Sequence, residues 1–511
     1  MKRVSGRMRL APALGLGLLA AVLAVPAQAG LLQHLRDSIQ EFTLDNGLRF
    51  VVVERRDAPI FSFATCVNAG NVCEVTGTTG IAHMFEHMAF KGTETIGTRD
   101  FAAESRALDR VDEAWEAVLE ERALGARADP ARLAERIAAF DAAQAEALAY
   151  IVPNEFSAVL EENGAQSVNA FTGYDQTCYF YSLPSNRLEL WARLEGDRMS
   201  RPVLREFYKE RDVVRNEKRM RVESSPLGRF YSDFLTMAFK SHPYGVEPVG
   251  VTEDIESFRR ADALEFFRRY YVSRNMTVVV VGDVALAEVR RLAQKYFLGV
   301  ADAPAPWPVL AREPEHTAER RLIAREEANP MVMIGWLGPG LSDPEYPAAE
   351  LLMQILGGGR SSRLYERLVK REKVATQAGA GTGMPGEKYP NQAVVFVTVS
   401  AGEDPLRAEQ MVYEEIARLV ADGPGEAELE KVKTAYLAGQ IRQLRQPIGL
   451  ALGLSMADQL RGHWGELFDH LDRISAVTAE EVRGLAGRLL TRERRTVGVM
   501  ERKTSDGGQQ G

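Results

Sequence analysis

The pattern of hydrophobic and polar positions predicts a sheet at the start of the chain and helices after residue 100. FTLDNGLRFVVVE, residues 42–54, predicts two strands around an Asn-Gly turn, and FSFATCVNAG, residues 61–70, predicts a third. Residues 101–150 instead carry Ala, Leu, Glu and Arg at helical spacing, broken once at GARADP. We therefore expect a helical hairpin inserted at the surface, whose charged positions form a solvated face rather than a binding motif.

The pattern repeats in broad outline in the second half of the chain. Residues 254–285 run from an amphipathic helical segment into the strand-like MTVVVVGDV, and residues 474–502 run from a similar segment into RTVGVMER. This repeat predicts the fold class α+β, with two homologous α/β half-domains that each combine helices with a sheet.

A proline-rich segment separates the two predicted halves. Residues 299–316, GVADAPAPWPVLAREPEH, contain four prolines, which prevent regular helix and sheet. We expect a stiff linker that holds the halves at a set separation. The predicted boundaries are residues 30–298 for the N-terminal half, with the insertion at about 101–150, residues 317–503 for the C-terminal half, and residues 504–511 for a flexible tail.

Residues 1–29 have the pattern of a secretory signal peptide. Four basic residues among the first nine precede an apolar run, residues 10–25, and Ala27-Gln28-Ala29 suits signal peptidase. Cleavage before Gly30 predicts a secreted, periplasmic protein. The alternative is an uncleaved membrane anchor, but Pro12 and Pro26 keep the apolar run below the length that spans a bilayer comfortably.

Charge and composition argue against two classes of function. Without residues 1–29 the 63 Lys and Arg fall to 59 against 71 Asp and Glu, a net charge of −12, which does not suit a nucleic-acid-binding protein. No later apolar run approaches the length of a spanning helix, so we expect no stable membrane span.

Three cysteines, Cys66, Cys73 and Cys178, give an odd number for an oxidising compartment, so at least one is unpaired or paired with another chain. Cys66 and Cys178 lie in strand-like runs and can meet across a sheet, whereas Cys66 with Cys73 would close a short loop. The sequence leaves both pairings open, together with unpaired buried thiols.

The segment GIAHMFEHMAFKGTE, residues 80–94, carries the candidate chemistry. On a helix, His83 and His87 at positions i and i+4 point to one side and can bind one metal ion, and Glu86 falls on the same face. This H-x-x-E-H order is the inverted form of a common zinc-protease motif. The alternative is a pair of surface histidines on an amphipathic helix, but the apolar flanking residues predict that this helix is half buried and that its polar groups need partners.

A catalytic zinc site needs a third protein ligand and one open position. The best candidate lies in FYKERDVVRNEKRMRVE, residues 207–223, where Glu210 and Glu217 are two helical turns apart on one face. We expect Glu217 to bind the metal and Glu210 to lie just behind it. From the residues alone, two ordinary solvent-facing glutamates remain an alternative.

Several motifs in order give the whole mature chain a resemblance to the M16 family of pitrilysin, insulinase and mitochondrial processing peptidase. Besides HMFEHMAFKGT, they are NAFTGYDQTCYFYSLP (169–184), ERDVVRNE (210–217), HPYGVEPVGVTEDI (242–255) and GGGRSSRLYERL (357–368). The resemblance implies one Zn²⁺ per chain, with His83, His87 and Glu217 as ligands, Glu86 as the catalytic base and Glu210 supporting the site. It also implies that a peptide substrate lies along an edge strand at Asn169, Ala170, Phe171 and Thr172.

One departure from the family concerns the groups that bind the substrate carbonyl. Self-sufficient members supply an Arg and a Tyr from the C-terminal half, where this chain has Val369 and Thr376, while Lys370 and Arg371 lie at the wrong helical phase. The resemblance therefore implies a homologous M16 partner subunit that carries the Arg and Tyr, with each chain forming half of a clam-shaped chamber. A heterodimer is expected, and a homodimer remains possible.

The sequence thus predicts a zinc-dependent endopeptidase that hydrolyses peptides or unfolded protein segments. The alternative is a non-catalytic structural or assembly subunit of the same family, which typically loses motif residues, whereas His83, Glu86, His87 and Glu217 are all present. A third alternative, a zinc-storage or zinc-delivery protein, would not need Glu86.

Overall fold

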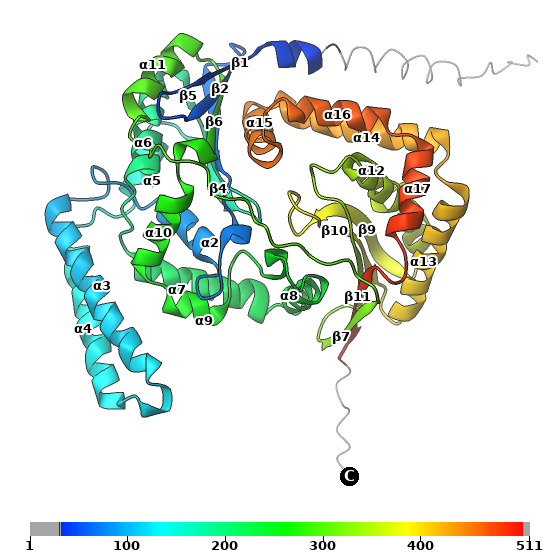
Figure 1. Cartoon of the computed structure of the whole chain (residues 1–511), viewed down its shortest axis with the longest axis horizontal. Helices are drawn as coiled ribbons and strands as arrows, with labels where there is room; N and C mark the ends of the chain where they lie inside the picture. Colours follow the sequence, from blue (N-terminus) through cyan, green and yellow to red (C-terminus); the bar gives the residue numbers. More distant parts are fainter. Residues whose placement is uncertain (1–29, 31, 504–511) are drawn as a thin grey trace, which may run out of the picture.

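Two twisted sheets, one in each half of the chain, organise the computed structural model, which describes residues 30 and 32–503 (Figure 1). The predicted signal peptide and tail lie outside the described residues. The N-terminal sheet has the strand order β1-β2-β6-β3-β5-β4. Its strands are β1 (Ile39–Thr43), β2 (Arg49–Glu54), β3 (Ile60–Val67), β4 (Gln166–Thr172), β5 (Thr177–Pro184) and β6 (Met276–Gly282).

The C-terminal sheet repeats this plan with the order β7-β11-β8-β10-β9. Its strands are β7 (Arg320–Glu326), β8 (Met331–Leu337), β9 (Ala375–Met384), β10 (Gln392–Val399) and β11 (Arg495–Arg502). Each sheet contains one parallel pair of strands, β2 with β6 in the N-terminal sheet and β7 with β11 in the C-terminal sheet. All other strand pairs in the two sheets are antiparallel. The predicted fold class of two homologous α/β half-domains is therefore confirmed.

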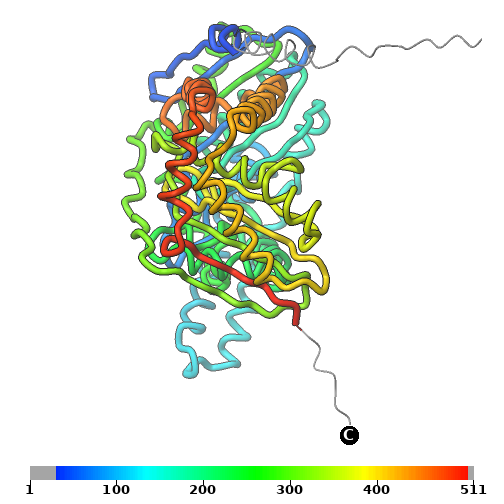
Figure 2. Tube along the Cα trace, turned by 90° about the vertical axis from the view of Figure 1, so that its right-hand side faces the viewer, coloured from blue at the N-terminus to red at the C-terminus, as the bar shows by residue number. Residues whose placement is uncertain are grey.

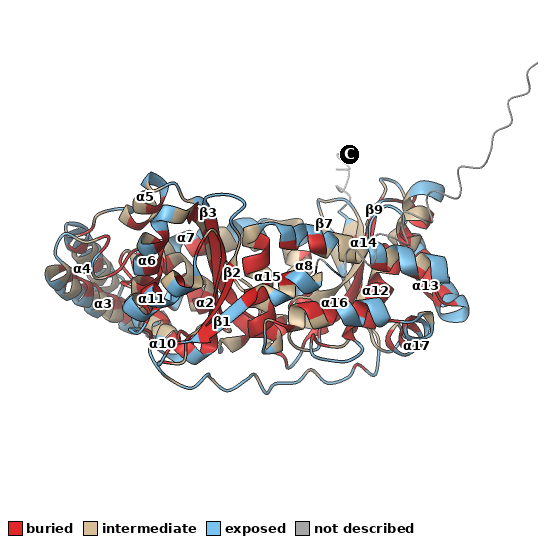
Figure 3. Cartoon of the chain, turned by 90° about the horizontal axis from the view of Figure 1, so that it is seen from above, coloured by how far each residue is buried: buried red, intermediate tan, exposed pale blue. Residues whose placement is uncertain are grey.

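Helices cover both sheets, and each segment that predicted a helix-to-strand unit forms one. The N-terminal half contains α2 (Ile81–Met88), α3 (Phe101–Ala123), α4 (Pro130–Leu148), α5 (Glu155–Glu162), α6 (Leu188–Ser200), α7 (Phe207–Lys218), α8 (Pro226–Ala238), α9 (Thr252–Ser257), α10 (Arg260–Tyr270) and α11 (Leu286–Tyr296). The C-terminal half contains α12 (Tyr346–Gly357), α13 (Pro405–Asp422), α14 (Glu426–Arg445), α15 (Pro447–Arg461), α16 (Glu466–Ala476) and α17 (Ala479–Leu489). The strand β2 is buried, whereas outer turns of α13 and α14 are exposed (Figure 3).

The two halves exchange one helix each. Helix α15 of the C-terminal half packs on β3 and β6 of the N-terminal sheet, where Leu450 and Leu454 join a core with Val51 and Val279 (Figure 1). Helix α8 of the N-terminal half packs in the same way on β7 and β11. A Cβ atom at Gly498 of β11 would lie 2.8 Å from a ring carbon of α8, so glycine makes room for this contact.

This exchange corrects the expected role of the proline-rich segment. Residues 301–317 form neither helix nor strand, as four prolines require. The halves are nevertheless in direct contact, because their exchanged helices bury apolar side chains against the opposite sheet. Packing sets their separation, and the linker is not a spacer. The domain boundaries remain a prediction.

Helices α3 and α4 form a hairpin that extends away from the two sheets (Figures 1 and 2). Its charged residues are mostly exposed, but its base is part of the N-terminal core: Trp115 and Phe140 are buried, and their rings pack at an angle against Tyr208 of α7. Glu104 is fully buried in an ion pair with Arg205, at 2.7 Å, so one acid of the predicted solvated face is internal. The hairpin therefore buttresses α7.

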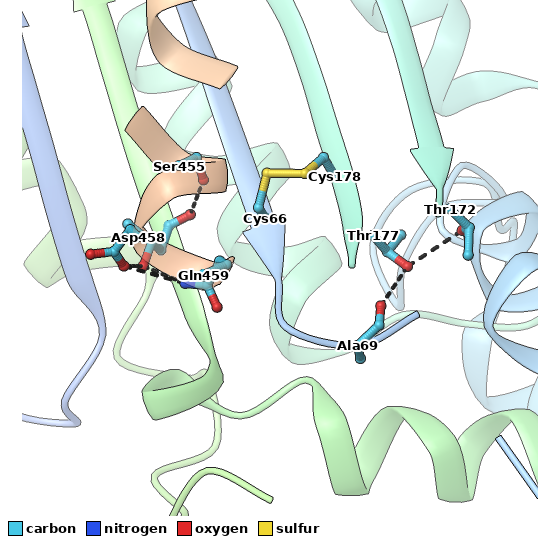
Figure 4. Close-up of a disulfide and its surroundings, with 9 residues drawn as sticks. Cys66, Ala69, Thr172, Thr177, Cys178, Ser455, Asp458 and Gln459 are labelled. Carbon is cyan, nitrogen blue, oxygen red and sulfur yellow. Dashed lines mark hydrogen bonds between the residues drawn. A yellow bond between two sulfur atoms is a disulfide. The ribbon is translucent and has the colours of Figure 1, made fainter. Parts of the chain in front are cut away.

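The structure resolves the open cysteine pairing. Cys66 of β3 and Cys178 of β5 face each other in the antiparallel register and form a disulfide (Figure 4). Cys73 keeps a free thiol. The bond lies beside α15, whose Ser455 donates to the Thr277 carbonyl of β6 at 3.3 Å (Figure 4). The disulfide thus ties two strands of the sheet that also carries the helix from the other half.

Among residues 30 and 32–503, no helix has the length and apolar character needed to cross a membrane.

Candidate metal centre

Helix α2 presents its polar side chains on one face because its other residues are apolar and buried. Ile81, Met84, Phe85 and Met88 pack into the N-terminal core, which leaves His83, Glu86 and His87 on the opposite side. The helix begins after Gly80, whose φ of +94° favours glycine. The same glycine allows a close approach, since a Cβ there would lie 2.7 Å from the Val249 carbonyl oxygen.

The carboxyl group of Glu74, a residue outside the motif, accepts hydrogen bonds from the backbone at the first turn of α2. Glu74 accepts hydrogen bonds from the backbone N–H groups of Gly80 and Ala82, each at 2.8 Å, and from the Asn71 amide at 2.9 Å. These N–H groups have no partner within the helix, and burial raises the pKa of Glu74 to about 8, so its carboxyl group accepts them mainly in its neutral form near pH 7. Glu74 therefore fixes where α2 begins, at Ile81, two residues before His83.

Three side chains from two helices converge on one point. His83 Nε2 lies 3.8 Å from Glu217 Oε1, and His87 Nε2 lies 3.6 Å from Glu217 Oε2. One ligand atom from each residue falls within 4.8 Å of the others. Four ligands around a tetrahedral zinc ion with bonds of about 2.0–2.1 Å are separated by roughly 3.4 Å, so the three groups fit such an ion with little movement.

The pKa values of the two histidines are shifted in opposite directions. Burial, aided by the neighbouring His87 and Arg221 charges, lowers the pKa of His83 to about 3, so its ring is neutral near pH 7, as a metal ligand must be. Burial also opposes the charged form of His87, but the Glu210 hydrogen bond and the Glu86 charge outweigh it and raise its pKa. A metal ion at this point would bind both rings in their deprotonated form.

Glu210 lies behind His87 as expected. Its carboxylate is 3.5 Å from His87 Nδ1 and 2.5 Å from Lys91 Nζ. Although burial opposes ionisation, these two cationic partners lower the pKa of Glu210 to about 2. A carboxylate on the second nitrogen of a ligand histidine fixes its ring orientation and raises its basicity. Lys91 also contacts Glu206 at 3.4 Å, so this lysine, just after the end of α2, pairs with both Glu206 and Glu210.

Glu86 lies between α2 and the edge strand β4. Its carboxyl group hydrogen-bonds to Thr172, the last residue of β4, and burial raises its pKa above the ordinary value. A cavity of about 400 Å³ is lined by Glu86, His87, Asn169 and Ala170. The structure therefore brings Asn169 and Ala170 close to His87, one of the candidate metal ligands.

Phe171 is the exception among the predicted substrate residues. Its ring packs near Phe180 of β5, with ring centroids 6.2 Å apart, and lines neither cavity described here. The structure thus places the Phe171 side chain outside both cavities.

A larger cavity of about 690 Å³ opens on the other side of the site, beside His83. Tyr174 and Tyr231 of the N-terminal half and Met333 and Phe396 of the C-terminal half line it. His83 thus lines the larger cavity and His87 the smaller one, so the three converging side chains lie between the two cavities. Residues of the second half form part of the wall of the larger cavity.

The stretch expected to lack the carbonyl-binding groups ends at the wall of this cavity: Gln377 and Thr398 line it, but Val369, Lys370, Arg371 and Thr376 do not. Val369 packs against the C-terminal core, and the Thr376 hydroxyl donates to the Thr398 carbonyl at 3.3 Å. Lys370 pairs with Glu366 at 2.5 Å, and neither it nor Arg371 lines the cavity beside His83.

A different arginine reaches the site. Arg221 lies in a π-helical turn, Arg219–Glu223, that continues α7, and its guanidinium is 2.6 Å from Glu217 Oε1. Its position one turn after Glu217 follows from helical spacing, but neither the π-helical turn nor the capping role of Glu74 has a signal in the sequence. Lys91 follows His87 by four residues, but α2 ends at Met88, so helical spacing does not place its side chain beside Glu210.

Comparison with known proteins finds two matching family signatures. The one described as "Insulinase (Peptidase family M16)" matches residues 49–114, which include His83, Glu86 and His87. The one described as "Peptidase M16 inactive domain" matches residues 257–436, which belong mainly to the second half. Glu217 lies between the two matches.

Similar proteins cover most of the chain. "Zinc protease PqqE" of Helicobacter pylori is 26% identical over 423 residues, 81% of this chain and 81% of that protein. "Uncharacterized zinc protease YmxG" of Bacillus subtilis is 22% identical over 89% of this chain and 96% of its own length. Among solved structures, a protease from Helicobacter pylori has a TM-score of 0.74 at 23% identity, covering 91% of this chain and 99% of that one. The periplasmic protease PqqL from Escherichia coli has a TM-score of 0.67 at 18% identity, and the match covers 91% of this chain but 48% of PqqL.

Proposed function

Since this chain belongs to the M16 family of peptidases, we propose that it is a zinc-dependent endopeptidase with His83, His87 and Glu217 as metal ligands and Glu86 as general base. The observation that carries the proposal is the convergence of the three ligand atoms within 4.8 Å, next to a free edge strand. The ligand set of two imidazoles and one carboxylate suits catalytic zinc and leaves a position open.

The chain's residues have distinct tasks in peptide hydrolysis. A peptide binds in extended form along β4 by main-chain hydrogen bonds, which brings one of its carbonyl groups to the metal site. Bound zinc would supply Lewis-acid polarisation of that carbonyl and a lowered pKa for water. Glu86 accepts the proton of the attacking water and passes it to the leaving amine. Its raised pKa brings it nearer to neutrality, where a general base works best.

The test of this function replaces Glu86, which transfers a proton but holds no metal. Glu86→Gln should keep its zinc and fold while peptide hydrolysis falls by about 10²–10⁴, the usual cost of a lost general base. Zinc is measured by mass spectrometry and hydrolysis with a mixture of synthetic peptides. Equal hydrolysis by the wild type and the variant would contradict the enzyme and favour the non-catalytic subunit.

We also propose that a homologous subunit completes the enzyme and that the protein works outside the cytoplasm. Two observations support the partner: Val369 and Thr376 replace the Arg and Tyr of self-sufficient members, and this chain matches only about half of PqqL. The location is supported by the description of PqqL as periplasmic. Losing such carbonyl-binding groups typically costs about 10²–10³ in turnover. Mixing with a homologous chain that carries the Arg and Tyr should therefore raise hydrolysis strongly, and full activity of the isolated chain would contradict this part.

A further inference from the structure

The 690 Å³ cavity beside His83 contains an acidic group that no other part of the account uses. Glu247, from the loop before α9, lines the cavity. Its Oε2 atom is buried and has no hydrogen-bond partner among the residues that the structure describes. A buried carboxylate oxygen without a partner is costly, so its presence in the wall of a substrate-sized cavity indicates a missing ligand group.

Neighbouring basic groups do not neutralise this carboxylate. Lys218 is near enough to favour the charged form of Glu247, but its ammonium donates to the Gly250 carbonyl at 2.5 Å. Arg221, at the metal end of the cavity, pairs with Glu217 at 2.6 Å. Burial raises the pKa of Glu247, which shows that its charge is poorly compensated by the protein itself.

The walls beside Glu247 suit a cation rather than an anion. Tyr174 and Tyr231 both line the cavity, and the Tyr174 hydroxyl is buried without a hydrogen-bond partner in the described chain. Burial raises the pKa of Tyr174, and it raises that of Tyr231 to about 12, so both rings are neutral near pH 7. Neutral aromatic faces attract ammonium and guanidinium groups, and the apolar Met333 and Phe396 can cover a long aliphatic stem.

Resting on the proposed peptidase function, we infer that this cavity is a specificity pocket for a Lys or Arg side chain close to the scissile bond, with Glu247 as the residue that binds its charge. The cavity touches both His83 and Thr172, the end of the edge strand, so a side chain that enters it comes from a peptide residue near the cleaved bond. Substrates with a basic residue at one fixed position relative to the cut are therefore preferred.

The first experiment maps cleavage. The protein, with its partner where one is needed, digests a mixture of N-acetylated synthetic peptides of varied sequence, and mass spectrometry identifies the cut bonds. Lys and Arg should be enriched at one position, and a peptide pair that differs only in Lys or norleucine there should differ in kcat/KM by about ten- to a hundred-fold, the range of a hydrogen-bonded charge. In Glu247→Gln the ratio of kcat/KM for the lysine peptide to that for the norleucine peptide should fall below about three, and in Glu247→Asp it should be partly kept. The control Glu253→Gln changes an exposed acid outside the cavity and should leave the ratio unchanged.

A second experiment separates this inference from the proposed function. In a Glu86→Gln background, calorimetry measures the Kd of the same peptide pair without hydrolysis, so the preference is tested even if catalysis fails. The lysine peptide should bind more tightly than the norleucine peptide, and Glu247→Gln should remove the difference. Equal binding of the two peptides, or a preference that survives Glu247→Gln in a folded variant, would overturn the pocket while leaving the metal site untouched.

Discussion

Replacing Glu74 with Ala tests how the fold positions the metal helix. The change removes the acceptor for two backbone N–H groups at the start of α2, each at 2.8 Å, and for the Asn71 amide. Burial raises the pKa of Glu74 to about 8, so the group is largely neutral near pH 7, and hydrogen bonds of this kind contribute about 0.5–1.5 kcal/mol each. Because water can replace part of what is lost at a helix end, we expect a net loss of about 2–4 kcal/mol in the free energy of unfolding.

The loss should be visible in function as well as in stability. His83 follows Ala82 directly, so a shifted first turn moves one metal ligand relative to His87, and zinc should bind more weakly. Unfolding in guanidinium chloride, followed by circular dichroism on zinc-free protein, gives the stability, and titration with a zinc-sensitive dye gives the affinity. Glu74→Gln keeps one oxygen acceptor and should lose less.

The matched control is Glu162→Ala, which removes an exposed acid from the end of α5 and should change stability by less than about 0.5 kcal/mol. If Glu74→Ala behaves like this control and keeps its zinc affinity, Glu74 does not position α2.

Two further predictions concern the contact between the halves. Leu454→Ala in α15 leaves a cavity at a fully buried position against the N-terminal sheet and should lower the free energy of unfolding in guanidinium by about 2–5 kcal/mol. The control Leu406→Ala, at an exposed position in α13, should lower it little. Similar values for the two variants would argue against the helix exchange. His242 is buried between Phe239, Tyr244 and Tyr389, and burial lowers its pKa to about 4, below the ordinary value of about 6.5. The unfolded state then binds a proton that the folded state does not, so up to about 3 kcal/mol of stability is present above pH 6.5 and is lost as the pH falls to 4. His242→Gln should flatten this pH dependence in urea unfolding, and an unchanged slope would contradict it.

Local patterns explain what the sequence could predict. The spacing of His83, Glu86 and His87 sets their common face on any helix, and the helix-to-strand repeat shows two similar halves without any knowledge of their packing. The resemblance adds the edge strand, whose position at the end of the sheet order matches the expectation for residues 169–172.

Long-range contacts explain what the sequence could not predict. An amphipathic pattern shows that α8 and α15 bury one face, but not that each covers the sheet of the other half, because both sheets offer similar apolar surfaces. The choice of Cys178 over Cys73 as the partner of Cys66 depends on the register of β3 and β5. Glu247 lies in the cavity through the path of a loop, which no periodicity describes.

The most direct test of the account is the zinc content of the purified mature protein and of Glu217→Gln, measured by mass spectrometry after dialysis. The account predicts about one zinc per chain in the wild type and in the exposed control Glu253→Gln, and almost none in Glu217→Gln, because two imidazoles alone hold the ion weakly. Peptide hydrolysis should disappear together with the metal. An unchanged zinc content in Glu217→Gln would contradict the metal centre built from His83, His87 and Glu217, and with it the proposed chemistry.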